Sequence, residues 1–422
     1  MHMETRNSKT EMPLFKVKGE KFIFVGEKTI MKLSDMCIMF EDGDWIESKD
    51  QSDDGIRLLQ TGNIGEGKFL EKEGKERFIS RETFKKLKCK EVFSGDILIS
   101  RLPEPVGRAC LVPEKKQRMI TAVDCTICRI DDKKIRRRYL CYYLQSANYY
   151  TQLKNSITGT TRKRISRKNL GNIEIKIPSD KKQEEVIKQL DLIVEIIDNK
   201  KKKLQLLDTL VKSRFVELFG DPKLNNKGWK IGIVSDYYEV KGGKRIPKGM
   251  GYARGVTKHP YLRATDMKNE TILDNDIHYI DDEVYEHIRR YTVKAGDIYL
   301  TNVGVNLGMA GIIPDKYDGA NLTENAVKLV PRTEKIMDGL FLAHYINSPG
   351  IQNYINERKM SVGVPKLAIF RIETMPLILP PIELQNQFAD FVASIDKSKS
   401  KIQKSLEETQ LLFDSLMQKY FG

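Results

Sequence analysis

The sequence has few of the residues that mark secreted, membrane-inserted or metal-binding proteins. Its 422 residues include six cysteines, too few for a disulfide scaffold and typical of a reducing cytosol. No apolar run approaches the ~18 residues of a membrane-spanning helix. The first residues, Met1 to Lys9, are polar and lack the apolar core of a secretion signal. These absences predict a soluble, cytoplasmic protein.

Basic residues outnumber acidic ones. Lys and Arg total 72 against 58 Asp and Glu, which gives a formal net charge of +14. At about 150 residues per domain the length predicts two or three domains, and a hydrophobic content of 40% is enough for real cores. A soluble protein this basic is often bound to a polyanion, either nucleic acid or an anionic membrane surface. We therefore expect an anionic partner.

The chain repeats itself with a period of about 202 residues. Each half is far too long for a solenoid unit, so the repeat predicts a tandem duplication of a domain followed by a helix. The matching segments occur in the same order in both halves: Leu59–Ile64 with Leu262–Met267, Gly95–Ile97 with Gly296–Ile298, Gly107–Pro113 with Gly308–Pro314, Leu140–Ser146 with Leu342–Ser348, Ile175–Pro178 with Leu377–Pro380, and Phe219–Gly220 with Phe421–Gly422.

Both halves show the same succession of elements. From about Met31 to Ile130, and again from Gly232 to Val330, short apolar runs alternate with Gly, Asp, Asn and Pro. That pattern predicts strands and turns with a few short helices, an α+β domain. Each domain then continues into one helical segment, near 139–153 or 340–358, and an apolar strand that ends at a proline.

Two long helices are predicted after these prolines. No Gly or Pro interrupts 181–219 or 382–421, and apolar residues recur there at heptad spacing. Two separate surface helices are the alternative, but each apolar stripe would project well beyond a domain of ~150 residues. Because the copies are joined head to tail, the stripes can pair only as an antiparallel coiled coil. The predicted seam residues are Ile187, Leu190, Val194, Ile197, Leu204, Val211, Ile395, Ile402, Leu406 and Leu416.

The resulting prediction is a pair of duplicated globular domains held at opposite ends of a helical rod. Its boundaries are an N-terminal extension at 1–30, a first domain at 31–180, a central helix at 181–220, a second domain at 221–380 and a C-terminal helix at 381–422.

Motifs for catalysis or metal binding are weak. Gly62–Lys68 resembles a phosphate-binding loop, but Phe69 stands where a Ser or Thr hydroxyl is needed. Cys125 and Cys128 have the spacing of a redox or zinc pair, yet no second pair follows and the other copy has apolar residues there. Asp96 and Asp297 recur as turn residues. We therefore predict neither catalysis nor a metal site in this chain.

Basic loops are the stronger functional signal. Between Lys154 and Ile173 every charged side chain is positive, in a Gly/Thr/Ser-rich loop that could follow a phosphate backbone, although a solvated charged loop is the alternative. Arg136–Arg138 could add phosphate contacts or simply cap the helix that follows. The candidate phosphate contacts are Arg162, Lys163, Arg164, Lys168, Lys244, Arg245 and Lys366.

A second set of polar residues lies beside strand or turn signals and differs between the copies. Arg, Gln and Asn suit the reading of base edges because they form paired hydrogen bonds with guanine or adenine. Two domains of one fold that read different sequences would differ in this way, and so would drifting surface residues. The candidates are Gln60, Thr61, Asn63 and Arg101 in the first copy, and Arg263, Thr265, Asp266 and Asn302 in the second.

Taken together, the pattern resembles the specificity subunit of type I restriction-modification systems, from about Ile30 to Gly422. The resemblance rests on the doubled architecture, on Gly-Asp-Ile followed by Gly107 or Gly308, and on the two terminal heptad helices. It also rests on the Ile-x-Ile-Pro and Leu-x-Leu-Pro-Pro turns, which are followed by Gln183 and Gln385. The first ~30 residues have no counterpart between the halves.

The resemblance implies a non-catalytic DNA-binding subunit. In that family each globular domain binds one half of a split site in double-stranded DNA. The antiparallel coiled coil sets the spacing and offers surface to two modification subunits. Those subunits carry S-adenosylmethionine and methylate adenine, so no cofactor is expected on this chain, and restriction (motor-nuclease) subunits complete the complex. The alternatives are a self-contained nuclease or methyltransferase with duplicated domains, and a coiled-coil scaffold that binds no nucleic acid.

Overall fold

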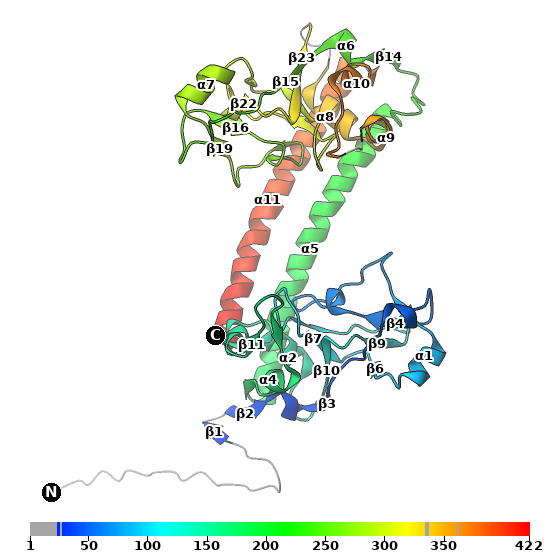
Figure 1. Ribbon diagram of the computed structural model, residues 1–422, viewed down its shortest axis with the longest axis vertical. Coiled ribbons are helices and arrows are strands. Elements are labelled where there is room, and N and C mark those ends of the chain that lie inside the picture. The colour runs from blue at the N-terminus through cyan, green and yellow to red at the C-terminus, as the bar shows by residue number, and fades with distance from the viewer. Residues whose placement is uncertain (1–22, 26–27, 334–336, 361–362) are drawn as a thin grey trace, which may run out of the picture. The chain divides into compact units, whose positions relative to one another are not determined.

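The computed structural model describes residues 23–25, 28–333, 337–360 and 363–422 (Figure 1). The chain divides into two compact units: unit 1 is Met1–Asn199 with Glu407–Gly422, and unit 2 is Lys200–Leu406. Most of the predicted extension at 1–30 lies outside the described residues. Two strands nevertheless begin inside it, β1 (Ile23–Val25) and β2 (Lys28–Lys32), so strand structure starts earlier than the repeat predicts.

Unit 1 is centred on an antiparallel sheet in the order β3-β10-β7-β8. The run Ile97–Ile99 has no exposed surface because successive side chains point to opposite faces, each covered by its own apolar cluster. The strands are β3 (Cys37–Asp42), β7 (Ile97–Ser100), β8 (Ala109–Leu111) and β10 (Cys125–Ile130).

Unit 1 also contains a second four-stranded sheet and a three-stranded sheet. One has the order β5-β4-β9-β6, with β4 and β9 parallel, and the other has the order β1-β2-β13. A hairpin of β11 (Ile157–Thr158) and β12 (Arg164–Ile165) stands apart from them. The remaining strands are β4 (Ile56–Leu59), β5 (Phe78–Ile79), β6 (Glu91–Val92), β9 (Met119–Thr121) and β13 (Glu174–Ile177).

Unit 2 repeats the central sheet and the parallel strand pair of unit 1. Its central sheet has the order β15-β23-β20-β21, the counterpart of β3-β10-β7-β8, and its strands β16 and β22 are parallel as β4 and β9 are. The strands are β14 (Lys230–Ile233), β15 (Tyr238–Gly242), β16 (Pro260–Leu262), β17 (Met267–Lys268), β18 (Thr271–Ile272), β19 (His278–Tyr279), β20 (Ile298–Thr301), β21 (Ala310–Ile312), β22 (Asn321–Leu322), β23 (Ala326–Pro331) and β24 (Pro376–Leu379).

The glutamines after the strand-ending prolines play the same part in both units. The Gln183 side chain accepts from the Arg136 N–H (2.9 Å) and donates to the Pro178 carbonyl. The Gln385 side chain accepts from the Asp338 N–H (2.9 Å) and donates to the Pro380 carbonyl. The sequence repeat is therefore a structural repeat down to single hydrogen bonds, which confirms the predicted duplication.

The segments predicted as single helices near 139–153 and 340–358 are each two helices. In unit 1 the first helix ends at Tyr143, and Ser146 caps the next by accepting from the Tyr149 N–H. Ser348 and Pro349 make the corresponding break in unit 2. The helices are α2 (Arg137–Tyr143) and α3 (Ala147–Lys154), and α8 (Gly339–Asn347) and α9 (Pro349–Arg358). The other short ones are α1 (Arg81–Lys86), α4 (Arg167–Gly171), α6 (Val234–Tyr237), α7 (Asp282–Ile288) and α10 (Ile369–Glu373).

The two long helices form as predicted, α5 over Asp180–Phe219 and α11 over Ile382–Phe421. In unit 1, α5 meets the end of α11, where the Tyr420 hydroxyl donates to Gln189 (2.5 Å). In unit 2, Asp208 of α5 pairs with Lys399 of α11 (2.7 Å), and Lys200 donates to Ser405. Residue numbers rise along one helix as they fall along the other, so the pairing within each unit is antiparallel. The predicted seam residues are all buried or half-buried.

An aromatic cluster joins the long helices to the globular part of unit 2. Phe219 of α5 and Phe388 of α11 have no exposed surface, and their ring centroids lie 5.6 Å apart. Phe341 of α8 packs on Phe219 with a centroid distance of 4.6 Å. Three elements far apart in the sequence therefore share one core.

We predict that Phe388→Ala lowers the unfolding free energy by about 3–5 kcal/mol, because it leaves a cavity in this cluster. The matched control is Phe370→Ala, where 59% of the side chain is exposed and a change within about 0.5 kcal/mol is expected. Denaturant titrations of both variants give the comparison. Equal losses would mean that the cluster does not stabilise the fold.

Candidate nucleic-acid interface

Three backbone segments of unit 1 converge where the central sheet meets the β4–β9 sheet. The Gly43 N–H donates to the Cys125 carbonyl, and the Asp44 N–H to the Thr121 carbonyl, both at 2.9 Å. A Cβ at Gly43 would lie 2.2 Å from the Thr121 carbonyl oxygen, so this approach requires glycine. The Arg101 N–H donates to the Asp124 carbonyl (2.9 Å), which brings the β7–β8 loop to the same place.

Unit 2 builds the same convergence from equivalent residues. The Gly243 N–H donates to Ala326 O (3.1 Å), and the Lys244 N–H to Leu322 O (2.8 Å). The Asn302 N–H donates to Asn325 O (3.0 Å). We call this surface of each unit its loop face: residues 43–46, 60–65, 101–108, 122–124 and 157–165 in unit 1, and residues 243–254, 263–266, 302–308, 323–325 and 363–366 in unit 2.

Arg108 holds the loop face of unit 1 together, a role that sequence reasoning missed. It is 8% exposed, and its guanidinium donates to four backbone carbonyls. Two of these, Thr61 O and Ile64 O, belong to the turn after β4, and two, Leu102 O and Pro105 O, belong to the β7–β8 loop. The counterpart in the repeat, Met309, carries no such group, so only the orientation inside the fold reveals this role.

Four of the predicted base-reading side chains point inward. Asn63, Arg101, Asp266 and Asn302 are each between 4% and 5% exposed. Asn63 and Asp266 occupy equivalent turns and accept from the Gln60 and Arg263 N–H groups, both at 2.9 Å. A direct contact with DNA would require these internal bonds to break.

Arg101 and Asn302 perform a second shared task. Arg101 pairs with Asp42 (3.1 Å) and donates to the Val123 carbonyl (2.7 Å), and its own carbonyl accepts from the Ile165 N–H. Asn302 is tied to Leu367 in the same way, through a backbone bond of 2.8 Å and a side-chain bond of 3.4 Å. In both units a buried polar residue anchors the segment that precedes a short helix, which is α4 in unit 1 and α10 in unit 2.

The other side chains predicted to contact base edges differ in how far they are exposed. Gln60 and Thr61 are half-buried and Thr265 is exposed. The Arg263 side chain donates to Asp266 and Asp276 and contacts His278. Its pKa is raised by the bond to Asp266 above all, so it stays charged and committed to that turn.

The predicted phosphate contacts are exposed. Arg162 and Lys163 lie at the tip of the β11–β12 hairpin, and Arg164, the first residue of β12, pairs with Asp124 of the loop face (3.3 Å). In unit 2, Lys366 forms an isolated bridge with Val303, beside Asn302. Lys168 lies in α4, and Lys244 and Arg245 follow β15. The structure thus brings most of the predicted cations onto the two loop faces.

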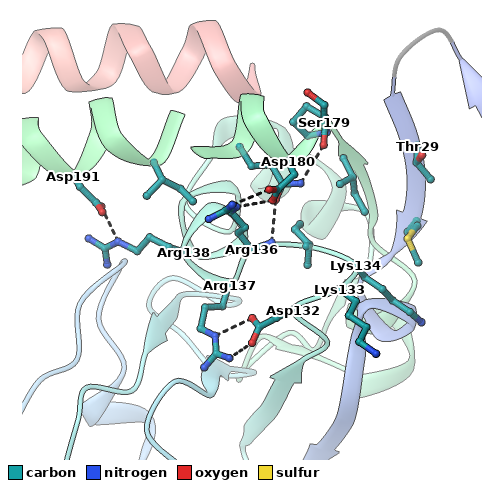
Figure 2. A pocket seen from close by; sticks show the side chains of 16 residues that line it. Thr29, Asp132, Lys133, Lys134, Arg136, Arg137, Arg138, Ser179, Asp180 and Asp191 are labelled. Carbon is teal, nitrogen blue, oxygen red and sulfur yellow. Dashed lines mark hydrogen bonds and ion pairs between the residues drawn. The ribbon is translucent and has the colours of Figure 1, made fainter. Parts of the chain in front are cut away.

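Arg136, Arg137 and Arg138 lie elsewhere, around a groove of about 990 Å³ in unit 1 that is also lined by β2 and the start of α5. Figure 2 shows each guanidinium directed at a different carboxylate. Arg136 pairs with Asp180 (2.6 Å), Arg138 with Asp191 (2.7 Å), and Arg137 with Asp132. Two of these acids belong to α5, so the triplet binds the long helix to the domain.

Cys125 and Cys128 are fully buried in β10, in the apolar clusters on its two faces. Burial raises the pKa of Cys125 to about 12, so its thiol is neutral at physiological pH and unsuited to binding a metal as thiolate. In the part of the chain that the structure describes, no group of three or more His, Cys, Asp or Glu side chains could hold a metal ion. No described helix is long and apolar enough to cross a membrane.

Asp96 and Asp297 are turn residues, as predicted. Their carboxylates accept from the backbone N–H three residues earlier, at Phe93 and Lys294, both at 2.8 Å. Each also pairs with a cation of the neighbouring strand, Arg129 or Lys328. Each carboxylate thus ties its turn to the neighbouring strand.

Both copies of the repeat match one protein family. Residues 26–209 and residues 226–409 each match the family described as type I restriction modification DNA specificity domain. The chain therefore belongs to this family and is a DNA specificity subunit, the non-catalytic part of a type I restriction-modification enzyme.

Individual relatives agree with this assignment. The chain is 21% identical to the type I restriction enzyme EcoKI specificity subunit of Escherichia coli K12 over 409 residues, 87% of this chain and 82% of that one. It is 22% identical to the MjaIX specificity subunit of Methanocaldococcus jannaschii over 303 residues, 67% of each chain.

Two solved structures share the fold. One is the S subunit of a type I restriction-modification system from M. genitalium, with a TM-score of 0.53, 15% identity, and coverage of 97% of this chain and 98% of that one. The other comes from a study of complex assembly and conformational transition of the type I system, with a TM-score of 0.54, 13% identity, and coverage of 95% and 99%.

We predict that Arg108→Ala loosens the loop face of unit 1. Its removal leaves four carbonyl groups without their charged donor, two in buried and two in part-buried hydrogen bonds, and each such bond contributes about 1.5–3 kcal/mol. Hydrogen exchange at residues 61–65 should accelerate at least tenfold, while Arg162→Ala, an exposed arginine, serves as the control. Unchanged exchange would show that Arg108 does not hold the loop.

Proposed function

We propose that each loop face contacts one half of a bipartite target in double-stranded DNA. The observation that supports this most directly is the β11–β12 hairpin. It exposes Arg162 and Lys163 at its tip and Arg164 at the start of β12, and Arg164 ties it to the loop face through Asp124. A basic two-stranded ribbon has the width to enter a major groove and the charge to follow phosphates. The equivalent loop face of unit 2 carries Lys244, Arg245 and Lys366.

We further propose a division of labour among the predicted contacts. Asn63, Arg101, Asp266 and Asn302 shape the loops from inside, and the exposed side chains touch DNA. This proposal explains why the polar differences between the copies come in matched pairs, since Asn63 and Asp266 cap the same turn with different chemistry.

We propose that the paired helices set the distance between the half-sites. A helix of 40 residues, the length of α5 and of α11, spans roughly 60 Å at 1.5 Å per residue. Reading heads spaced by such a helix pair would lie more than one DNA turn, about 34 Å, apart. Antiparallel pairing with the two domains at opposite ends, over the boundaries 31–180 and 221–380, would leave unread base pairs between the half-sites.

The modification subunits are proposed to dock on the same helices. Large apolar side chains remain exposed along them, with Leu206 and Leu210 one helical turn apart and 56% and 46% exposed. Such side chains are expected beneath a protein partner rather than in water. We expect S-adenosylmethionine, adenine methylation and the restriction motor to reside on the partner subunits, in the cytoplasm where the DNA is.

Replacing Arg162, Lys163 and Arg164 together with Ala tests the DNA interface. Each phosphate contact contributes about 0.9 to the slope of log K against log salt, so the slope should fall by up to about 2.7. The matched control replaces Arg81, Lys85 and Lys86 of α1, which Figure 1 shows well apart from β11 in unit 1, and should leave the slope unchanged. A wild-type slope in the hairpin variant would remove it from the interface.

Deleting one heptad from each helix, residues 201–207 and 400–406, tests the spacer. The helices would shorten by about 10 Å, equivalent to about three base pairs. A methylation map of cells that carry the variant should show the same half-sites with a shorter spacer. A matched deletion in α5 alone breaks the pairing with α11 and should abolish modification. An unaltered spacer in the double deletion would contradict the proposal that the helices set the distance between the half-sites.

A further inference from the structure

Arg245 differs from Arg263, which also lies on the loop face of unit 2. Its side chain is 78% exposed, and only its Nε is bonded, to Glu324 Oε1 at 2.6 Å. The Arg263 side chain is 20% exposed, and its donors face Asp266, Asp276 and His278. Arg245 therefore presents its two terminal amino groups to solvent while its stem is held in place.

The carboxylate that holds Arg245 is itself fixed. Glu324 accepts from the Thr323 hydroxyl (3.1 Å) and lies 3.4 Å from the hydroxyl of Tyr261, which is 2% exposed. The same Tyr261 hydroxyl donates to the carbonyl of Lys244, directly before Arg245 (2.8 Å). The buried phenol of Tyr261 thus anchors the backbone before Arg245 and lies beside the carboxylate that positions its guanidinium.

The Glu324 side chain is held in its ionised form. Burial acts to raise its pKa, but the hydrogen bonds from Arg245, its own backbone N–H and Thr323 outweigh burial and hold the pKa below its ordinary value. The carboxylate is therefore ionised at neutral pH and keeps the Arg245 Nε as its donor.

This pair borders a cavity of about 470 Å³ on the loop face. The cavity is lined by Tyr252, Tyr261, Arg263 and Asn325 as well as by the pair itself. Its volume accommodates the edge of a base.

Unit 1 has different chemistry at the equivalent place. The bonds from Asp44 to Thr121 and from Lys244 to Leu322 set the equivalence, which makes Trp45 the counterpart of Arg245. Val123 is the counterpart of Glu324, because Asp124 and Asn325 accept the matching bonds from Arg101 and Asn302. Trp45 is 70% exposed and cannot offer paired donors. At this position the arginine and its carboxylate are present in unit 2 and absent from unit 1, where the loop face instead pairs the exposed Arg164 with Asp124.

We propose that Arg245, braced by Glu324, reads a guanine in the half-site that unit 2 contacts. This inference rests on the proposed function and adds a specific base to it. With Nε occupied, the remaining Nη1 and Nη2 donors match the O6 and N7 acceptors that guanine presents in the major groove. The brace lowers the rotamer entropy lost on binding, as pre-organised contacts do.

The test uses the assembled complex of this chain with its modification subunits. The wild-type target is first defined by its methylated sites. Binding is then measured on duplexes in which each base pair of the target is changed in turn, and on duplexes in which each guanine is replaced by 7-deazaguanine, which lacks N7. The variants are Arg245→Lys, which keeps the charge but not the paired donors, and Glu324→Gln, which weakens the brace. The control is Lys248→Ala, an exposed cation of the same loop.

We expect wild type to prefer guanine at one position of one half-site by roughly 5- to 150-fold. Arg245→Lys should abolish that preference, and Glu324→Gln should reduce it. Both should retain discrimination in the other half-site, which also shows that the complex is assembled. The 7-deazaguanine duplex should bind wild type as weakly as a substituted base pair does, and Lys248→Ala should alter only the salt dependence.

Three results would overturn the inference while leaving the proposed function intact. The first is a uniform loss of affinity in Arg245→Lys with all base preferences retained, which would make Arg245 a phosphate contact. The second is relaxation at a position that is not a guanine, and the third is a target half without guanine. Failure of the proposed function is separate, because it would appear in the wild type as the absence of any bipartite target.

Discussion

The packing of α5 against α11 is the interaction on which the rest of the molecule depends. Each helix carries an apolar stripe that no single domain of this size could cover. In unit 1 the stripe is buried where Val186 and Leu190 share a core with Met417 and Phe421. In unit 2 it is buried among Phe215, Phe219 and Phe388. The cores of both globular parts are therefore completed by residues from both helices.

The loop faces show how one scaffold can be given two specificities. Backbone hydrogen bonds at Gly43 and Gly243 recur without change, and the anchoring roles of Arg101 and Asn302 recur with different side chains. Next to them the chemistry diverges completely. Asp44 accepts from the Lys90 N–H in unit 1, whereas the equivalent Lys244 lies over the ring of Tyr291 in unit 2. Conserved internal bonds hold the backbone, so the exposed positions are free to differ.

Polar residues in such loops divide into two populations, which a sequence does not distinguish. Asn63 and Asp266 differ between the copies as base-reading residues would, yet both cap the same turn from within. Arg263 and Arg245 both lie near turns. Arg263 forms ion pairs with two aspartates, whereas the side chain of Arg245 is exposed. The distinction depends on which way a side chain points from its backbone, and that direction is set by neighbours distant in sequence.

The chain's duplication, its two long helices and its family could be recognised from the sequence alone. These features depend on the order of matching segments and on the spacing of apolar residues along the chain. The helix limits fell within one residue of α5 and α11, since proline, glycine and heptad spacing act locally. Other features required the folded chain. The break at Ser146 was missed because a cap depends on local geometry, and the roles of Arg108 and Glu324 were missed because their partners lie far away in sequence. Long-range contacts, rather than local propensity, decide which polar side chains support the loops and which face a ligand.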